Sequence, residues 1–188
     1  MKFIRTDIPD VVIIEPTVFG DERGYFVETF RQDKLHEFLG VSIHFLQDNE
    51  SKSSYGVLRG LHYQLAPAAQ TKLVRVIKGK VLDVAVDIRT DSPTFGEHVS
   101  VELSEQNKRQ LLIPRGFAHG FVVLEDDTVF AYKVDNYYSP VHDRGIAFND
   151  PAIGINWGVD KDALKLSPKD TSQVLLAKAE VFNGGTLY

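Results

Sequence analysis

The run TKLVRVIKGKVLDVAVDI, residues 71–88, decides the fold class. β-Branched and other apolar side chains fill both halves of the run, and Gly79 separates the halves between Lys78 and Lys80. Such residues are enriched in β-strands, and a Gly between two apolar runs is a turn signal. The run therefore predicts two consecutive strands joined by a tight hairpin at Gly79.

Similar short β-type runs cover most of the chain. They are bounded by Gly, Pro, Asp or Ser and span residues 11–16, 24–30, 98–104, 108–114, 120–126 and 128–138. Helix signals are few: residues 31–40 have apolar side chains at helical spacing and a closing Gly, and residues 160–166 suit one short turn. This pattern predicts an all-β fold, a jelly-roll barrel with a few short peripheral helices. No linker or repeat divides the sequence, so we expect a single domain over residues 1–188.

The bulk composition argues against several classes of protein. The net charge of −5 provides no basic field for binding nucleic acid. The chain has no Cys, so it can form neither a disulfide framework nor a thiolate metal site. Residues 1–16 contain no apolar run long enough for a signal peptide or a membrane span. We expect a cytoplasmic protein that binds neither nucleic acid nor membranes.

Two stretches resemble the metal-binding motifs of the cupin type of jelly roll. In the first stretch, five residues separate Gly56 from His62, and six residues separate Lys72 from Gly79. The second His position of that motif holds Gln64, and Lys72 stands in place of the Glu ligand; the second motif, PRGFAH, ends in His119. A protonated Lys has no lone pair to donate and repels a dication. The frame therefore predicts a cupin-type barrel without a metal.

Proton chemistry can replace metal chemistry in such a barrel. An ammonium stabilises an oxyanion or enolate, and an imidazole titrates near working pH. His62 is therefore a candidate general base and Lys72 a candidate enolate stabiliser, although a hydrogen-bonded structural His and a solvated strand Lys are the ordinary alternatives. Strand alternation places His62 and Gln64 on one face and Arg59 on the other, unless Gly60 bends the chain.

A collinear set of blocks resembles the dTDP-4-dehydrorhamnose 3,5-epimerases. The blocks run in order from about Glu15 to Asp170 and read DERGYFVETF, QDNESKS, GVLRGLHYQ, KLVRVIKGKVLDVAVDIR, IPRGFAHGF, YKVDNYYSP, FNDPAIGINW and LSPKD. The resemblance implies a homodimeric cupin-like barrel that uses no cofactor. It implies epimerisation of dTDP-4-dehydro-6-deoxy-D-glucose at C3 and C5, through enolates, to dTDP-4-dehydro-L-rhamnose.

The resemblance also implies roles for individual residues. The base is His62, the carboxylate that orients it is Asp170, and the acid on the opposite face of the sugar is Tyr132. Lys72 stabilises the enolate oxygen, and Asp83 positions Lys72. Taken alone, Tyr132 would be an ordinary barrel aromatic and Asp170 a turn or helix-cap residue.

Further residues are expected to support the reaction or to bind the substrate. His119 lies near His62 in the family. Arg pairs well with diphosphate oxygens, amides offer hydrogen bonds, and a Tyr can stack on the thymine. The expected substrate-binding residues are Arg23, Phe26, Glu28, Gln47, Asn49, Arg59 and Tyr137, of which Arg23, Phe26 and Glu28 act in the site of a neighbouring subunit.

Three positions depart from the family pattern. Asp143 stands where Glu is usual, Phe148 where Trp is usual, and Gly158 where Pro is frequent. We expect all three in loops away from His62, where they affect nucleotide binding more than the base.

Three alternative functions remain open at this stage. A relative that inverts only C3 or only C5 would keep the same His, Lys and Tyr. A metal-dependent cupin enzyme is disfavoured by Gln64 and Lys72. A non-catalytic sugar-binding barrel is disfavoured because all four positions with proposed chemical roles are occupied.

Overall fold

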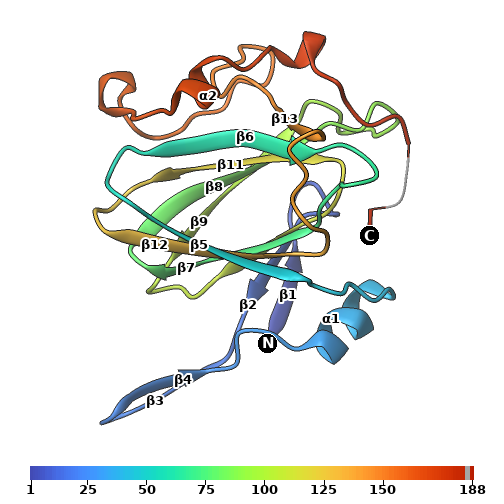
Figure 1. The fold of residues 1–188 in the computed structure, drawn as a ribbon. Coiled ribbons are helices and arrows are strands. Elements are labelled where there is room, and N and C mark those ends of the chain that lie inside the picture. Colours follow the sequence, from blue (N-terminus) through green and yellow to red (C-terminus); the bar gives the residue numbers. More distant parts are fainter. Residues whose placement is uncertain (185–186) are drawn as a thin grey trace.

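Two antiparallel sheets packed face to face form the body of the molecule, and the computed structural model describes residues 1–184 and 187–188 (Figure 1). The first sheet has the strand order β1 (Lys2–Arg5), β2 (Val12–Glu15), β10 (Gln110–Ile113), β7 (Lys72–Lys78), β12 (Thr128–Val134), β5 (Gln47–Ser53). The second has the order β13 (Asp143–Gly145), β6 (Leu58–Gln64), β11 (Phe117–Val123), β8 (Lys80–Asp87), β9 (His98–Ser104). Buried side chains of both sheets meet in one core, among them Val74 and Phe130 from the first and Ala85 and Leu103 from the second. The predicted all-β fold is confirmed, and the architecture is a cupin-type jelly roll.

The helices are few and short, as predicted. α1 (Gln32–Leu39) ends at Gly40, which has a φ of 75° and donates its N–H to the carbonyl of His36. The predicted short turn near Asp160 is η1 (Lys161–Ala163), and α2 (Pro168–Thr171) and η2 (Leu176–Lys178) follow it. No helix in residues 1–184 or 187–188 is long and apolar enough to cross a membrane.

The predicted hairpin at Gly79 is wrong. β7 pairs with β10 and β12, whereas β8 pairs with β11 and β9, so the chain passes from one sheet to the other at this Gly. Gly79 has a φ of 80°, and a Cβ there would lie 2.3 Å from Oγ1 of Thr128. The same local signal, a Gly between two apolar runs, marks a corner between sheets as well as a hairpin. The corner places Lys72 and Asp83 in different sheets.

A β-bulge in β6 resolves the difficulty over which way Arg59 points. His62 pairs with His119 and Arg59 with Phe121, so β6 has two residues where β11 has only Gly120. The extra residue inverts the alternation, and Arg59 and His62 both reach the same cavity. Gly60 is required at this point because its φ is 142° and a Cβ would lie 2.5 Å from the Cα of Gly120.

The C-terminal part of the chain covers the outer face of the second sheet (Figure 1). Ile146, Ile153 and Trp157 pack there against Leu58 and Leu61 in a second buried cluster. A parallel bridge joins residues 57 and 165, and another joins residues 146 and 174. This docking carries α2 to the side of β6, where it delivers Asp170 to the cavity.

An N-terminal hairpin extends away from the body (Figure 1). It consists of β3 (Val18–Asp21) and β4 (Gly24–Val27). Phe19 and Phe26 are paired across it and are 61% and 67% exposed. Such exposed aromatic area on a two-stranded ribbon is unusual for a surface without a partner.

Candidate active site

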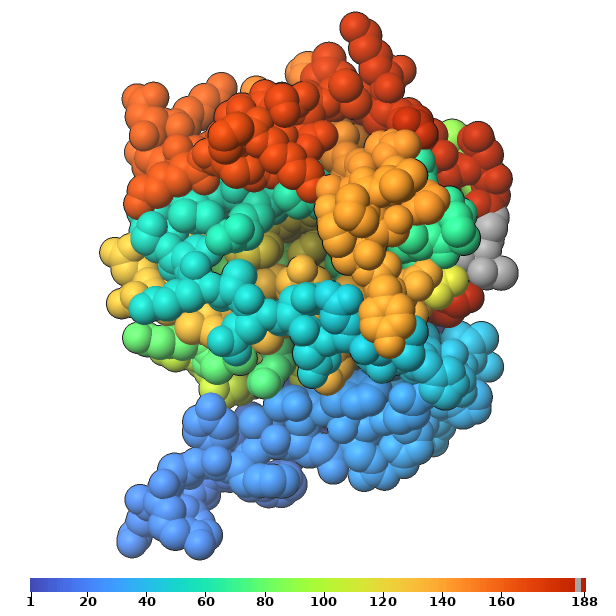
Figure 2. Space-filling view, in the orientation of Figure 1, coloured from blue at the N-terminus to red at the C-terminus, as the bar shows by residue number. Residues whose placement is uncertain are grey.

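A cavity of about 470 Å³ opens between the two sheets. Figure 2 shows the surface hollowed between β5, in cyan, and β6, in teal. His62 and His119 line the cavity from the second sheet, Lys72 and Tyr132 from the first, and Asp170 from α2. Residues far apart in the sequence therefore converge on one space, including all the residues expected to act in catalysis.

His62 and Asp170 form a close pair at one wall. Nε2 of His62 lies 2.7 Å from Oδ1 of Asp170, although the ring N–H is not aligned for a hydrogen bond. The Asp170 side chain is 4% exposed and that of His62 is 28% exposed, so the imidazole reaches the cavity while the carboxylate stays behind it. Burial raises the pKa of Asp170, but the contacts with His62 and Ser167 outweigh this effect and lower the pKa to about 2. The carboxylate is therefore ionised at neutral pH.

A second His–Asp pair lies deeper in the cavity. Nε2 of His119 is 2.9 Å and 3.0 Å from the two carboxylate oxygens of Asp83, and both side chains are buried. Burial lowers the pKa of His119, and the Asp83 carboxylate only partly opposes this effect. His119 is thus neutral at neutral pH. Asp83 makes its hydrogen bonds to His119, and its charge acts on Lys72 without a hydrogen bond between them. The expectation that Asp83 positions Lys72 stays a prediction.

Lys72 supplies a cation beside His62. Its Nζ donates to the backbone oxygen of His62 at 3.3 Å. Burial lowers the pKa of Lys72 to about 8, while the Asp83 and Asp143 carboxylates oppose that shift. The ammonium form therefore predominates at neutral pH but lies close to its titration point.

Tyr132 projects from β12, in the sheet opposite His62. Burial raises the pKa of its phenol, and the charge of Arg59 opposes this. The phenol is therefore protonated at neutral pH. A base on one wall and a proton donor on the other can address opposite faces of a ring held between them.

Two of the expected substrate-binding residues line this cavity, namely Asn49 and Arg59. Gln47 supports the first of them, since its Nε2 donates to Oδ1 of Asn49 at 2.8 Å. Tyr137 is 63% exposed and does not line the cavity, whereas its neighbour Tyr138 does. The expectation that Tyr137 stacks on the thymine stays a prediction.

The three hairpin residues expected to bind substrate lie outside the cavity of their own chain. Arg23 is paired with Asp21 in the exposed turn, and Phe26 and Glu28 follow in and after β4. None of the three lines the cavity. This placement agrees with the expectation that they act in a neighbouring subunit, which stays a prediction.

Asp143 corrects another expectation. It was expected in a loop away from His62, but it lies in β13, pairs with Gln64 and lines the cavity. Tyr138 donates its hydroxyl to Oδ2 of Asp143 at 3.2 Å, and Lys169 forms an ion pair with the same oxygen. Lys169 also lines the cavity. Its place next to Asp170 in the sequence could have suggested this. The other departures fit the expectation better: Phe148 packs in the outer cluster, and nothing lies within 4 Å of a Cβ built at Gly158.

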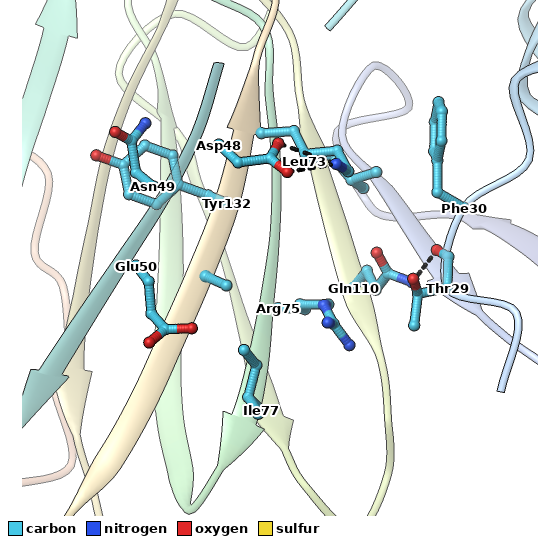
Figure 3. Close-up of a pocket in the computed structure, with 12 residues that line it drawn as sticks. Thr29, Phe30, Asp48, Asn49, Glu50, Leu73, Arg75, Ile77, Gln110 and Tyr132 are labelled. Atoms are coloured by element: carbon cyan, nitrogen blue, oxygen red, sulfur yellow. Dashed lines mark hydrogen bonds and ion pairs between the residues drawn. The ribbon is translucent and has the colours of Figure 1, made fainter. Parts of the chain in front are cut away.

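A second, smaller pocket of about 310 Å³ lies on the outer face of the first sheet and shares Asn49, Glu50 and Tyr132 with the cavity (Figure 3). Arg75 and Ile77 of β7 line it, and Lys133 pairs there with Asp48 at 2.9 Å. Gln110 closes its edge by donating to the carbonyl of Thr29 at 2.6 Å. His62 and Asp170 do not line this pocket, so we place the chemistry between the sheets.

Within residues 1–184 and 187–188, no group of three or more His, Cys, Asp or Glu side chains is arranged to hold a metal ion. In the cupin frame, the position of the Glu ligand holds the Lys72 ammonium and the second His position holds Gln64. Gln64 is instead used in the protein, where its Oε1 accepts the N–H of Ser139 at 2.8 Å.

Comparisons with known proteins identify the family of the chain. The family model described as dTDP-4-dehydrorhamnose 3,5-epimerase matches residues 5–178. A curated relative of that name from Shigella flexneri is 56% identical over 182 residues, which cover 97% of this chain and 99% of the relative. A crystal structure of dTDP-6-deoxy-D-glucose-3,5-epimerase from Legionella pneumophila Philadelphia 1, in complex with dTDP-4-keto-L-rhamnose, superposes with a TM-score of 0.94 at 47% identity and covers 98% of this chain and 99% of that one. A 3'-monoepimerase from Streptomyces bikiniensis in complex with dTDP-quinovose gives a TM-score of 0.87 at 31% identity, with coverage of 92% and 87%.

The resemblance read from the sequence blocks is thereby confirmed over nearly the whole chain. The match includes the strands that carry His62, Lys72, His119 and Tyr132, as well as the segment that carries Asp170. The chain belongs to the dTDP-4-dehydrorhamnose 3,5-epimerase family.

Proposed function

We propose that the protein epimerises dTDP-4-dehydro-6-deoxy-D-glucose at C3 and C5 to dTDP-4-dehydro-L-rhamnose. The observation that carries this proposal is the His62–Asp170 pair, 2.7 Å apart, in one cavity with Tyr132 on the opposite sheet. Family membership supports the substrate, because the Legionella enzyme was crystallised with dTDP-4-keto-L-rhamnose.

The reaction needs only proton transfers. The 4-keto group acidifies the hydrogens on C3 and C5, and His62 removes one of them as general base to leave an enolate. Asp170, ionised behind the ring, stabilises the imidazolium that forms, as a triad carboxylate does. Tyr132 then protonates the carbon from the other face and inverts it. Because each cycle returns one proton for each proton removed, no oxidant, reductant or organic cofactor is required.

Lys72 is proposed to hold the enolate oxygen. The ammonium beside His62 takes the place of a Lewis acid at the point where negative charge develops. His119, neutral and fixed on Asp83, supports the same wall of the cavity. At the mouth, Arg59 and Asn49 are proposed to bind the nucleotide diphosphate half of the substrate.

The pH dependence of kcat should report the protonation state of Lys72. Its pKa of about 8 means that the charged, active form predominates below that pH and is lost as the pH rises through it. We therefore expect kcat to fall on the alkaline side, with Lys72→Met slower by about 10²-fold at pH 7 and lacking this alkaline limb. Lys78→Met, at the exposed end of the same strand, is the matched control and should retain the limb. An unchanged alkaline limb in Lys72→Met would assign the titration to another group.

The function is tested by NMR in deuterated water. The protein is mixed with dTDP-4-dehydro-6-deoxy-D-glucose without added metal or nicotinamide, and the sugar protons are followed. Loss of the proton signals at both C3 and C5, with an L-sugar product, supports the double epimerase. Loss at one carbon indicates a single-position epimerase, the alternative kept open by the likeness to the 3'-monoepimerase. Loss at neither carbon would contradict epimerase activity.

We also propose that the active protein is a homodimer in which each site is completed by the partner's hairpin. The exposed Phe19 and Phe26, and the position of Arg23 outside its own cavity, support this arrangement. Mixing two inactive variants, His62→Ala and Arg23→Ala, should restore activity, because exchanged subunits form one site with both residues intact. A mixture that stays inactive although subunit exchange is demonstrated by mass spectrometry would contradict the shared site.

The cytoplasm is the proposed location. A nucleotide-diphosphate sugar carries two negative charges and does not cross a lipid bilayer unaided. The enzyme must therefore work in the compartment where its substrate is made, and cell fractionation would test this.

A further inference from the structure

The orientation of the Asp170 carboxylate determines whether it can serve His62. Oδ1 lies 2.7 Å from Nε2 of the imidazole, so a partial rotation of the carboxylate would lengthen this contact. Oδ1 also accepts the backbone N–H of Gly60 at 3.3 Å, at the bulge in β6. A fixed orientation of the carboxylate therefore also requires a hydrogen-bond partner for Oδ2.

Ser167 provides that contact. Its hydroxyl donates to Oδ2 of Asp170 at 2.5 Å, and the same Oγ accepts the backbone N–H of Asp170 at 3.2 Å. The hydroxyl therefore donates its single proton to the carboxylate, and its oxygen accepts a hydrogen bond from the backbone. Although Ser167 lines the cavity, its donor faces Asp170 and is not available to a substrate.

The local sequence resembles a capping box, but its acid makes different contacts. Ser167 is the N-cap of α2, Pro168 fills the first helical position, and Asp170 stands where a capping box places its acid. In a capping box that acid turns back to the N-cap N–H. Here both oxygens of Asp170 are used elsewhere: one meets Ser167, and the other meets His62 and Gly60.

We propose that Ser167 is a positioning residue that fixes the Asp170 carboxylate against His62 and so sets the efficiency of the general base. This inference rests on the proposed function. The hydroxyl acts in two ways: it prevents the carboxylate from rotating, and it stabilises the anionic form. The second effect agrees with the low pKa of Asp170, to which the contacts with His62 and then Ser167 contribute against burial.

The test compares Ser167→Ala with Ser167→Thr, which retains a hydroxyl, and with Ser172→Ala. Ser172 ends the same short helix and donates to the carbonyl of Lys169, so it reports the effect of loosening α2 alone. For Ser167→Ala we expect kcat for C3 and C5 deuterium exchange to fall about tenfold, the loss typical of a hydrogen bond to a charged group. KM should stay within about twofold, since the substrate contacts are untouched.

The pH profile of kcat distinguishes a role of Ser167 in positioning Asp170 from a role as N-cap of α2 alone. Without the donor the Asp170 anion is less stabilised, so the pKa of Asp170 rises and the acid limb of kcat moves upward. Ser167→Thr should restore both rate and limb. Ser167→Gly, which keeps an acceptable N-cap but has no hydroxyl, should behave like Ser167→Ala and covers the case in which the Ala variant folds poorly.

Two results would overturn the inference. One is a wild-type rate and acid limb in Ser167→Gly; the other is an equal loss in Ser167→Ala and Ser172→Ala that follows the folded fraction with the limb unmoved. Wild-type protein that exchanges neither proton would instead contradict the proposed function, so the two failures are distinguishable.

Discussion

Replacing His62 by Ala is expected to reduce kcat about 10²–10⁴-fold, the contribution of a well-placed general base. The imidazole is the basic group whose partner, Asp170, is ionised and buried behind it. Deuterium exchange at both C3 and C5 should fall together if one base serves both carbons. Binding of dTDP should change little, because His62 lies at the proposed sugar end and Arg59 and Asn49 remain in place.

The measurement is single-turnover exchange by NMR, with dTDP affinity determined by calorimetry. His44→Ala is the control, because His44 is an exposed histidine in the segment before β5. A second variant, Asp170→Asn, should also be slow, and the double variant should lose much less than the product of the two single losses, since residues that act as a unit are not additive. Exchange near the wild-type rate in His62→Ala would show that another group is the base.

The sequence predicted most of the fold because its strands carry their own signal. β7, β8, β9 and β12 are rich in β-branched and aromatic residues, and each was expected close to its observed position. β5 gave no such signal. Its sequence, QDNESKS, is wholly polar: it is an edge strand, and Asn49, Glu50 and Ser51 line the cavity. Its backbone is held by pairing with β12, as between Asn49 and Tyr132. That pairing joins distant parts of the chain, so no local pattern reveals it.

The site was predictable where it follows a local motif and not where it depends on tertiary contacts. His62 stands out as the retained His of a cupin frame and Lys72 as the replacement of its Glu ligand. Tyr132 and Asp170 are ordinary residues by local criteria and were identified only through the family resemblance. The bulge at Gly60, which turns Arg59 into the cavity, arises from the close approach of β6 to Gly120. Asp143 and Tyr138 reach the cavity through the path of the segment before β13, which no periodicity describes.

Changing Tyr132 to Phe should separate proton removal from inversion. His62 lies on one sheet and Tyr132 on the other, so the base can still take a proton when the phenol is absent. The resulting imidazolium exchanges with deuterated solvent and can return a deuteron to the same face. We therefore expect deuterium to enter the substrate with its configuration retained, while inverted product falls about 10²-fold or more, the usual contribution of a general acid.

The informative quantity is the ratio of deuterium incorporation to inverted product in one NMR time course, because it is independent of the fraction of folded protein. Phe keeps the ring that packs beside Phe130, so the substitution removes the hydroxyl with little change in the core. Tyr137→Phe, at an exposed position outside the cavity, is the matched control and should keep the wild-type ratio. Normal yields of inverted product from Tyr132→Phe would eliminate the phenol as the acid. Loss of incorporation and inversion in parallel would place Tyr132 in the first proton transfer, and the opposed arrangement of base and acid across the two sheets would then not be the source of inversion.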